Sequence, residues 1–426
     1  MNPYTAYFES LGKAARSASM AGQVLSTDDK NRILEQIACD LETAIPTILE
    51  ANSIDCSHAK ENRVPSVMMD RLRLTKERIE GICEGVRQVA NLRDPIGTVL
   101  ETRTLGNGLR IEKRQIPIGV IGMIYEARPN VTVDAAALAI KTGNAIILRG
   151  GKEAYQPSEA MVQIMQGSLE RCGAPKELVQ LVSILEREAV GELLAQRKWI
   201  DVMIPRGGAG LIQFVVNNSK IPVIETGSGV VHGYVDASAD ETMTLQVLEN
   251  AKLSRPSVCN AMETILLHEG RLQDLGPKIV AMLEEKGVAI YGDEQIQSLS
   301  SQVKPATEDN WPTEYNDYIV NFKVVSSIDD AITHINTFGT KHSEMIITED
   351  PTKAEQFMNL LDASTVYVNA STRFTDGFEF GLGAEIGIST QKLHARGPMG
   401  LDALTSYKYF VSTSDTRKLG LSNTAA

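Results

Sequence analysis

The sequence predicts an α/β protein built from two parallel β-sheets, and two observations support this class. Short apolar runs rich in β-branched residues alternate with helical segments from residue 117 onwards, and a second series of the same kind follows Asp236. Strand–helix–strand spacing of this kind is typical of βαβ units, in which helices cover both faces of a parallel sheet. A chain of 426 residues is long enough for two or three domains, each with its own core.

The N-terminal 90 residues are predicted to be helical, because Ile33, Ile37, Leu41 and Ile45 recur every four residues and form an amphipathic stripe. In the first α/β series we expect strands at 120–124, 145–148, 178–182, 200–204 and 221–224, and helices near 131–142, 157–171, 187–196 and 209–217. In the second series we expect strands near 262–267, 288–290, 319–325, 343–347 and 364–368, and helices near 240–252, 271–286, 328–337 and 351–361.

Two segments stand outside this alternation. Residues 98–115 are predicted to form two strands joined by a turn at Asn107-Gly108, and residues 404–411 are predicted to form a further strand. The hairpin is either an arm used in assembly or a plain surface excursion, and the pattern alone favours neither.

Composition excludes several classes of function. The chain has 42 Lys and Arg against 54 Asp and Glu, a net charge of −12, which argues against a nucleic-acid or membrane-surface role. No apolar stretch approaches the roughly 18 residues of a membrane span, and residues 1–11 do not resemble a signal peptide. The five cysteines are scattered and the six histidines show no metal-ligand spacing, so we expect a cytoplasmic protein without disulfides or a metal site.

The most promising chemical group is the thiol of Cys259, in the stretch K-L-S-R-P-S-V-C-N-A at 252–261. Pro256 fixes its own φ and drives Arg255 towards extended geometry, which predicts a turn just before the cysteine. A thiol at the exit of a turn is accessible, and the nearby cations Lys252 and Arg255 favour its thiolate form. Cys259 is therefore either a nucleophile or an inert buried residue, which is the commoner role of a free cysteine.

Two glycine-rich loops follow predicted strands and precede predicted helices. They are Arg149-Gly150-Gly151-Lys152 and Arg206-Gly207-Gly208. Glycine lets the backbone approach a phosphate, and a helix N-terminus supplies N–H groups to hold it. Neither of the standard nucleotide-binding fingerprints is present, so on spacing alone these loops are either a cofactor site or ordinary turns.

Taken together, these residues resemble the aldehyde dehydrogenase superfamily over nearly the whole chain. The motifs that carry the resemblance are Y-E-A-R-P-N-V-T-V-D at 125–134, L-R-G-G-K-E-A at 148–154, E-T-G-S-G-V-V-H at 225–232, K-L-S-R-P-S-V-C-N at 252–260 and the glycine-rich stretch at 380–401. The resemblance implies two Rossmann-like parallel-sheet domains plus a β-hairpin oligomerisation arm. It assigns residues 1–98 and 117–228 to a cofactor-binding domain, 229–391 to a catalytic domain, and 99–116 with 392–426 to the arm and C-terminal segment of a homo-oligomer.

The activity implied by the resemblance is that of a branch of the superfamily that reduces an acyl phosphate. The reaction is L-glutamyl 5-phosphate plus NADPH giving L-glutamate 5-semialdehyde and phosphate, a step of proline biosynthesis. Cys259 is then the nucleophile and forms a thioester, and the substrate is expected to bind to Arg128, Arg255, Arg373 and Arg396. The cofactor is expected to bind to Arg149, Gly150, Gly151, Lys152, Gly207, Gly208 and Glu314.

The choice of cofactor follows from one position. NAD-using relatives place a glutamate, which accepts a hydrogen bond from the adenosine ribose, where this chain has Lys152. A cation suits a 2′-phosphate better than a hydroxyl, so NADP is expected, and no metal ion is needed.

Three further positions of the superfamily are matched only in part. Glu225 matches the general base of the family, and we expect it either to activate Cys259 or only to pair with a cation. The asparagine that stabilises the oxyanion is replaced by Ala127, so Asn130 is named as the oxyanion donor together with the Cys259 backbone N–H. Glu314 keeps the first position of the motif E-x-F-G-P, whose other residues are lost.

Two other functions remain open at this level. A hydrolytic aldehyde dehydrogenase has the same fold and the same cysteine but resolves the thioester with water, and a non-catalytic relative only binds a ligand. Because the labile acyl phosphate must come from a separate protein, a transient contact with glutamate 5-kinase is a further hypothesis.

Overall fold

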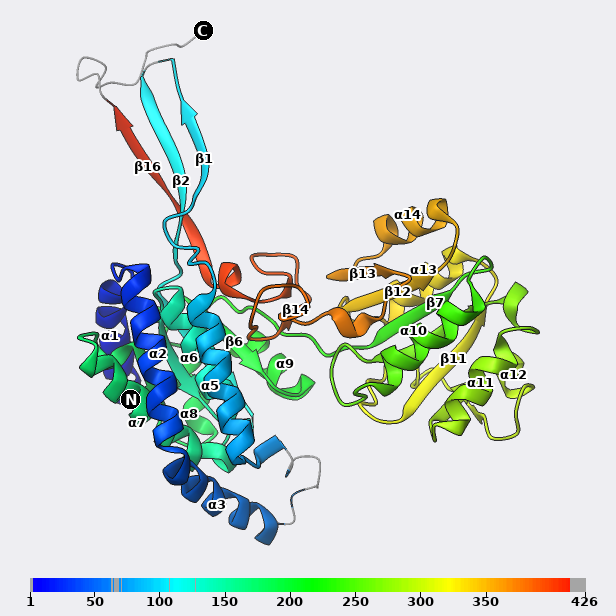
Figure 1. The fold of residues 1–426 in the computed structure, drawn as a ribbon, viewed down its shortest axis with the longest axis horizontal. Coiled ribbons are helices and arrows are strands. Elements are labelled where there is room, and N and C mark those ends of the chain that lie inside the picture. The colour runs from blue at the N-terminus through cyan, green and yellow to red at the C-terminus, as the bar shows by residue number, and fades with distance from the viewer. Residues whose placement is uncertain are drawn as a thin grey trace.

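The computed structural model describes residues 3–62, 64, 69, 71–106, 108–126 and 128–413. Within them the chain forms two α/β domains, placed side by side, and a narrow β-sheet that projects away from both (Figure 1). The predicted turn residue Asn107, the oxyanion-position residue Ala127 and the C-terminal residues 414–426 lie outside the described residues.

The first domain is built on a four-stranded parallel sheet of order β5-β4-β3-β6. Its strands are β3 (Val120–Tyr125), β4 (Ala145–Arg149), β5 (Val179–Leu181) and β6 (Val202–Arg206). Its helices are α6 (Pro129–Lys141), α7 (Tyr155–Arg171), α8 (Glu188–Leu194) and α9 (Ala209–Asn218), with short 3-10 turns at η1 (Lys152–Ala154) and η2 (Lys176–Leu178). All six residues of β3 are buried, as expected for a strand with a helix layer on each side.

The N-terminal helices form an outer layer of the first domain. They are α1 (Thr5–Gly22), α2 (Thr27–Thr43), α3 (Ile45–Glu61) and α5 (Lys76–Asn91). Helix α2 begins at a capping box, in which the Ser26 side chain accepts from the Asp29 N–H and the Asp29 carboxylate accepts from the Ser26 N–H. The predicted stripe Ile33, Ile37 and Leu41 is buried in the domain core, and α2 and α5 both pack on α6.

The strand predicted at 221–224 is wrong. Only Val223 makes a β-bridge, to Met203 of β6. Pro222 has no N–H to donate, so this segment cannot extend the ladder, although its carbonyl accepts a hydrogen bond from the Met203 N–H at 2.8 Å.

The second domain contains a seven-stranded parallel sheet of order β10-β9-β11-β8-β7-β12-β13. Its strands are β7 (Val231–Val235), β8 (Met262–His268), β9 (Ala289–Gly292), β10 (Lys304–Pro305), β11 (Ile319–Val325), β12 (Ser343–Ile347) and β13 (Thr365–Val368). Its helical elements are α10 (Glu241–Leu253), η3 (Glu269–Arg271), α11 (Gly276–Glu285), α12 (Glu294–Gln297), α13 (Ile328–Phe338), α14 (Pro351–Leu360) and η4 (Thr372–Phe374).

The two faces of this sheet have separate cores. Val235, Ile265 and Leu267 pack with residues of α10 and α11 on one face, whereas Tyr234 and Leu266 pack with residues of α13 and α14 on the other. Successive side chains of a strand point to opposite faces, so the continuous apolar runs noted in the sequence fill both cores.

The projecting sheet is antiparallel and has the order β1-β2-β16. It pairs the predicted hairpin, β1 (Val99–Thr104) and β2 (Leu109–Pro117), with the predicted C-terminal strand, β16 (Thr405–Thr413). All residues of β1 are exposed, and Figure 1 shows no helix against these strands beyond the base of the sheet. We call this sheet, residues 99–117 with 405–413, the arm.

The chain returns to the first domain before it enters the arm. Ile386, Met399 and Leu404 belong to the core of the first domain, so residues 386–391, assigned from the sequence to the catalytic domain, pack in part against the other one. This return segment contains the two-stranded ladder β14 (Ile388–Ser389) and β15 (Gly397–Pro398) and ends at η5 (Leu401–Leu404).

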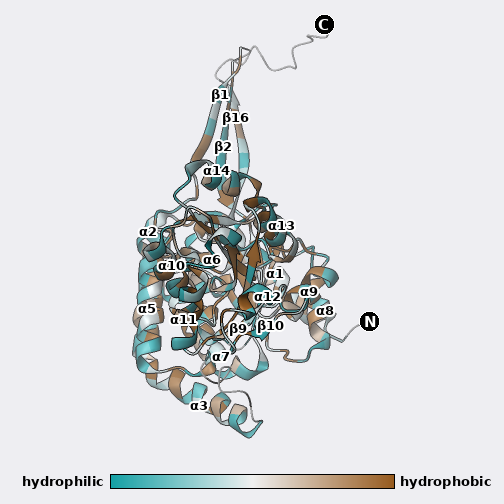
Figure 2. Ribbon diagram, turned by 90° about the vertical axis from the view of Figure 1, so that its right-hand side faces the viewer, coloured by the Kyte–Doolittle hydropathy of each residue, from teal (hydrophilic) through white to brown (hydrophobic). Residues whose placement is uncertain are grey.

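The described helices are too short or too polar to span a bilayer. Figure 2 shows why: helices such as α3 and α5 carry hydrophilic and hydrophobic residues side by side along their length.

Candidate active site

A cleft of about 1170 Å³ lies between the two α/β domains. The first domain contributes α5, the segment before it and the start of α6, and the second contributes residues 255–258 and 315–318. The chemically active residues in its lining are Arg71, Arg73, Arg78, Arg128, Asn130, Asp134, Arg255, Asp317, Asp376 and Glu385. The cleft is therefore rich in guanidinium groups, as a site for an anionic substrate would be.

The predicted nucleophile lies in a loop that closes one wall of this cleft. Residues 254–261, here called the nucleophile loop, connect the end of α10 to the start of β8. Lys252 and Glu263, one on each side of the loop, form a completely buried ion pair at 2.7 Å. Glu263 also accepts from the Asn316 N–H at 3.0 Å, so both ends of the loop are held in place.

The loop is also held from the segment after β13. Arg373 donates from Nε to the Ser254 hydroxyl at 3.1 Å and from its guanidinium to the Asn260 side-chain oxygen. The Asn260 amide donates to the Thr375 carbonyl at 2.8 Å. Arg373 thus donates to residues before and after Cys259, and these hydrogen bonds hold the nucleophile loop in place.

Cys259 itself is partly buried. Burial raises the pKa of its thiol, Arg206 and Arg128 act in the opposite direction, and Glu314 adds to the increase. A carbon atom added at Gly229 would lie 1.5 Å from the Cys259 carbonyl oxygen. The second glycine of the E-T-G-S-G motif is therefore required, because the backbone of Cys259 approaches it closely.

Three arginines near the thiol keep their guanidinium groups free of hydrogen bonds and ion pairs to any residue the structure describes: Arg128, Arg206 and Arg255. Burial and the neighbouring charge of Arg206 lower the pKa of Arg128 to about 10, so this group remains a cation at neutral pH. These arginines are available to an anionic ligand, in contrast to Arg373.

The structure does not bring Arg396 into the cleft. Arg396 contacts Asp362 at 2.7 Å, and the same carboxylate also contacts Lys341 at 3.0 Å and Lys392 at 3.3 Å. These cations keep the pKa of Asp362 below its usual range. Arg396 is therefore already paired within the chain, and this ion-pair cluster ties the return segment to the second domain. The expected role of Arg396 in substrate binding stays a prediction.

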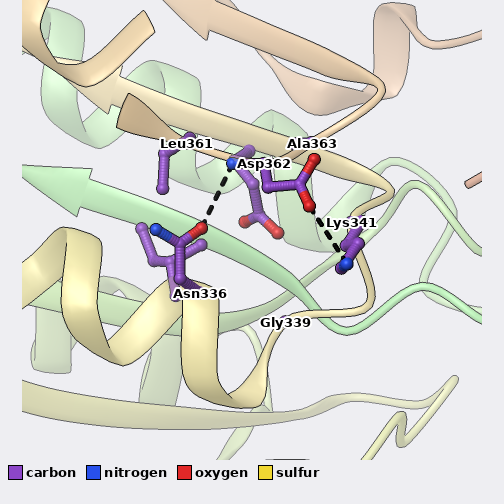
Figure 3. Close-up of a pocket in the computed structure, with 8 residues that line it drawn as sticks. Asn336, Gly339, Lys341, Leu361, Asp362 and Ala363 are labelled. Carbon is purple, nitrogen blue, oxygen red and sulfur yellow. Dashed lines mark hydrogen bonds and ion pairs between the residues drawn. The ribbon is translucent and has the colours of Figure 1, made fainter. Parts of the chain in front are cut away.

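Asp362 also borders a smaller cavity of about 140 Å³ at the end of α13. Figure 3 shows two of its polar contacts, the Asp362 N–H donating to the Asn336 side-chain oxygen at 3.1 Å and the Asp362 carboxylate facing Lys341. This cavity is lined by no residue of the nucleophile loop, whereas residues 255–258 of that loop line the large cleft, which makes the large cleft the candidate active site.

The residues predicted to bind a cofactor lie at the carboxyl ends of β4 and β6. Arg149 donates to the carbonyls of Gly150 and Leu185, both at 2.8 Å. Gly150 packs against Tyr125, since an added carbon there would lie 3.2 Å from the tyrosine ring. Lys152 is exposed and starts η1, directly after the half-buried Gly151.

The second glycine loop begins α9. The Gly208 N–H donates to the Glu126 carboxylate at 3.0 Å, and an added carbon at Gly207 would lie 2.7 Å from the same carboxyl group. A carboxylate thus occupies the N-terminus of α9, where the helix dipole favours negative charge. This observation shows that the loop accepts an anion, as a pyrophosphate site requires.

The remaining predicted residues lie around the nucleophile with different contacts. Asn130 lines the cleft and donates to Asp134 at 3.0 Å. Glu314 accepts from the Gly229 N–H at 2.9 Å, and its charge reaches Cys259. Glu225 lies on the link between the domains, where its N–H donates to the Gln391 side chain at 3.0 Å.

Sequence reasoning gave no role to two residues that the structure places beside the nucleophile, Arg206 and Glu385. Arg206 opens the glycine loop after the strand predicted at 200–204, as Arg149 opens the loop after the strand predicted at 145–148, and this equivalence was the signal available. Glu385 lies in the glycine-rich stretch, which has no periodicity from which its neighbours could be inferred. Burial raises the pKa of Glu385 to about 7.

The fold and the site together are those of an α/β enzyme class in which the loop before a candidate cysteine nucleophile lines a cleft between two parallel-sheet domains. The model of the aldehyde dehydrogenase family matches residues 6–305. The chain belongs to the aldehyde dehydrogenase family, as the resemblance of its motifs predicted. In the described part of the chain, no cluster of His, Cys, Asp and Glu is arranged to hold a metal ion.

Within this family, relatives at about 50% identity share one activity in their names. A gamma-glutamyl phosphate reductase of Clostridium beijerinckii is 52% identical, covering 94% of this chain and 97% of the relative. One of Ligilactobacillus salivarius is 50% identical, covering 94% and 96%. The crystal structure of gamma-glutamyl phosphate reductase from Thermotoga maritima superposes with a TM-score of 0.93 at 44% identity, covering 95% of this chain and 98% of that chain.

Proposed function

We propose that this chain reduces L-glutamyl 5-phosphate to L-glutamate 5-semialdehyde with NADPH and releases phosphate, which is a step of proline biosynthesis. The observation that carries this proposal is the cleft itself: Arg128 and the residues just before Cys259 line it, and the guanidinium groups of Arg128 and Arg206, which act on the Cys259 thiol, have no carboxylate partner among the described residues. The substrate carries a phosphate and a carboxylate, and guanidinium groups bind both kinds of anion. The names of the relatives at about 50% identity support the same substrate.

The reaction begins with the Cys259 thiolate, which attacks the acyl carbon of the substrate. A carbon–sulfur bond forms, the bond from carbon to the bridging oxygen breaks, and phosphate leaves with that electron pair. NADPH, when bound, supplies the hydride that reduces the resulting thioester. The Cys259 backbone N–H and Asn130 are proposed to stabilise the oxyanion, and release of the aldehyde regenerates the thiolate.

The first domain has the groups that NADPH requires. The N-terminus of α9 already accepts a carboxylate from Glu126, which supports a pyrophosphate position at Gly207 and Gly208. Lys152 is exposed at the end of β4, so it is proposed to pair with the 2′-phosphate. Glu314 is proposed to hold the nicotinamide ribose, and Arg149 with Gly150 and Gly151 to shape the adenosine end.

Glu225 is proposed to influence Cys259 or a nearby cation and not to activate water for hydrolysis. Arg206, Glu314 and Arg128 are the charged groups that act most strongly on the Cys259 thiol. A reductase that activated water would hydrolyse its own thioester to glutamate. Glu225 is not among the charged groups that act most strongly on the thiol, which suits an enzyme that reduces the thioester and does not hydrolyse it.

Further parts of the proposal concern assembly and location. The arm is proposed to join copies of the chain in a homo-oligomer. We further propose that the protein is cytoplasmic. We also propose that it makes a transient contact with the kinase that produces the labile acyl phosphate. A coupled assay with a scavenger of free acyl phosphate tests the contact, because channelled substrate would be protected.

The reverse reaction is the experiment that tests the activity. NADP reduction is followed with L-glutamate 5-semialdehyde, with and without phosphate or arsenate, for wild type and Cys259→Ala. The proposal expects strict dependence on the oxyanion and loss of activity in the variant. Steady turnover without phosphate would instead identify a hydrolytic aldehyde dehydrogenase, and activity in Cys259→Ala would contradict the role of the cysteine.

A further inference from the structure

Arg206 is the last residue of β6 and lies beside Tyr125 of β3 in the sheet register. Its guanidinium passes beneath the return segment of the chain, because a carbon added at Gly387 would lie 3.1 Å from Nη1. Gly387 has φ +154, and the same added carbon would lie 3.0 Å from Thr226. The side chain of Arg206 is therefore enclosed between the two segments that link the domains, and Gly229 of the first of these segments meets the Cys259 carbonyl oxygen.

The surroundings of Arg206 lack the acceptor that an enclosed guanidinium needs. Its charge lowers the pKa values of Cys259, Asp134 and Glu385, yet no ion pair or hydrogen bond joins its side chain to any residue within the described ranges. In the same neighbourhood the Ser389 hydroxyl and one Glu385 oxygen are buried without a partner, and Ser389 is completely buried. A partly buried guanidinium group whose N–H donors have no acceptor is unfavourable, whereas a bound anion would accept hydrogen bonds from it.

We propose that Arg206 is a catalytic residue of this reaction, which together with Arg128 binds the phosphate group of the substrate beside Cys259. The inference rests on the proposed function and assigns the phosphate to these two guanidinium groups. Arg128 lines the cleft, and the charges of Arg128 and Arg206 act on each other and on the same thiol. A phosphate dianion between them removes their mutual repulsion.

The pair then acts on two steps of the reaction. Before attack, the two cations favour the thiolate form of Cys259. As the bond from the acyl carbon to the bridging oxygen breaks, negative charge grows on the departing phosphate, and the same guanidinium groups neutralise it. No proton donor to the phosphate is required, because phosphate is a stable leaving group.

Kinetics of the reverse reaction test this inference. Arg206→Gln removes the cation, and we expect the KM for phosphate to rise roughly 10- to 100-fold, which corresponds to the loss of a charged hydrogen bond, with the KM for semialdehyde changed less than about threefold. Arg206→Lys keeps the positive charge but lacks the paired N–H donors of a guanidinium group, so its KM for phosphate is expected to lie between those of wild type and Arg206→Gln. Arg197→Gln, at an exposed position of the same domain, is the control for removal of a positive charge.

A second readout does not depend on turnover. The rate at which iodoacetamide alkylates Cys259 is measured against pH, with and without inorganic phosphate. In wild type, phosphate should protect Cys259, and in Arg206→Gln the protection should disappear and the pH midpoint should move upwards, because a cation beside the thiolate has been lost.

The outcomes separate this inference from the proposed function. If wild type shows no phosphate dependence at all, the proposed function fails. If wild type depends on phosphate but folded Arg206→Gln and Arg206→Lys keep the wild-type KM for phosphate and the wild-type protection, only the inference is overturned. A rise in the KM for NADP with an unchanged KM for phosphate would likewise overturn it.

Discussion

Gly229 shows how the backbone around the nucleophile restricts the sequence. Any side chain there would collide with the Cys259 carbonyl, so Gly229→Ala must displace the nucleophile loop or the link between the domains. We expect kcat to fall by about 100-fold, since a displacement of roughly 1 Å at a reacting group has an effect of this size. Gly191→Ala is the matched control, because an added carbon there meets nothing within 4 Å. Activity of Gly229→Ala within twofold of wild type would contradict this account of the glycine.

The pKa of Cys259 predicts the pH dependence of its reactivity. Burial raises the pKa of the thiol above its ordinary value, and only the thiolate reacts. The alkylation rate of Cys259 in the free enzyme should therefore increase through pH 9 without reaching a plateau below it. The measurement follows the Cys259 peptide by mass spectrometry, because Cys39 is also exposed. A plateau near pH 7 would show that the thiol is already ionised in the free enzyme.

At the level of single residues, sequence reasoning named residues that the structure gathers at one cleft but only part of their surroundings. Arg128 and Asn130 line the cleft together with residues 255–258 of the nucleophile loop. The first two follow the carboxyl end of β3, whereas the nucleophile loop precedes β8. Arg373 and Arg396 were expected at the substrate and instead hold segments of the chain together. The sequence does not reveal which arginines find a partner within their own chain, because the partners are distant in sequence. Arg396 contacts the Asp362 carboxylate 34 residues away, and Arg373 contacts the Asn260 side-chain oxygen 113 residues away.

The elements on either side of the nucleophile loop depend on the buried pair Lys252–Glu263. Lys252→Met would leave the Glu263 carboxylate without its cation in a site where neither side chain is exposed. We expect this variant to lose about 3–5 kcal/mol of unfolding free energy, measured by chemical denaturation.

The double variant Lys252→Met with Glu263→Gln provides the control for this prediction. It removes both charges and keeps an oxygen that can accept from the Asn316 N–H, as Glu263 does at 3.0 Å. Most of the lost stability should return. A double variant no more stable than Lys252→Met alone would show that the cost arises from packing and not from the unpaired charge.

Most of the longer elements followed from periodicity, and two failures among the sheet strands have physical causes. Residues 221–224 are apolar and β-branched but contain Pro222, which cannot donate to a ladder. Strand β7 lies at the centre of its sheet but was not predicted, because V-H-G-Y-V contains a polar residue and a glycine. Its His232 is accommodated by Glu344 of the neighbouring strand, which accepts from the His232 N–H at 2.7 Å, a contact that the sequence does not show.

At the scale of the whole molecule, the arm has no hydrophobic core of its own. We therefore expect another copy of the chain to cover its exposed apolar side chains. A three-stranded sheet needs a covered face to be stable, and its large exposed apolar side chains are Val99, Leu100, Tyr407, Tyr409, Phe410 and Val411. We expect wild type to be a homo-oligomer by light scattering. Tyr409→Asp with Val411→Asp should shift it towards the monomer, whereas Ser412→Asp, which adds charge without removing an apolar side chain, should not. A monomeric wild type would contradict the assembly role of the arm.

The two segments that link the domains connect these scales. Gly229 of the first segment meets the nucleophile loop of the second domain, and Gly387 of the second segment meets Arg206 at the end of β6 in the first domain. The active site therefore exists only when both domains are in place, and an intermediate bound to Cys259 is the most direct sign that they work together.

The central claim is a glutamyl thioester on Cys259 that is resolved by phosphate. The measurement is mass spectrometry of the Cys259 peptide after wild type has been mixed with semialdehyde and NADP in the absence of phosphate, alongside the NADPH formed. The account predicts a burst of about one NADPH per site, a glutamyl adduct on Cys259, and loss of the adduct with renewed turnover when phosphate is added. Continuous NADPH formation without phosphate, or an adduct on any other residue, would contradict it.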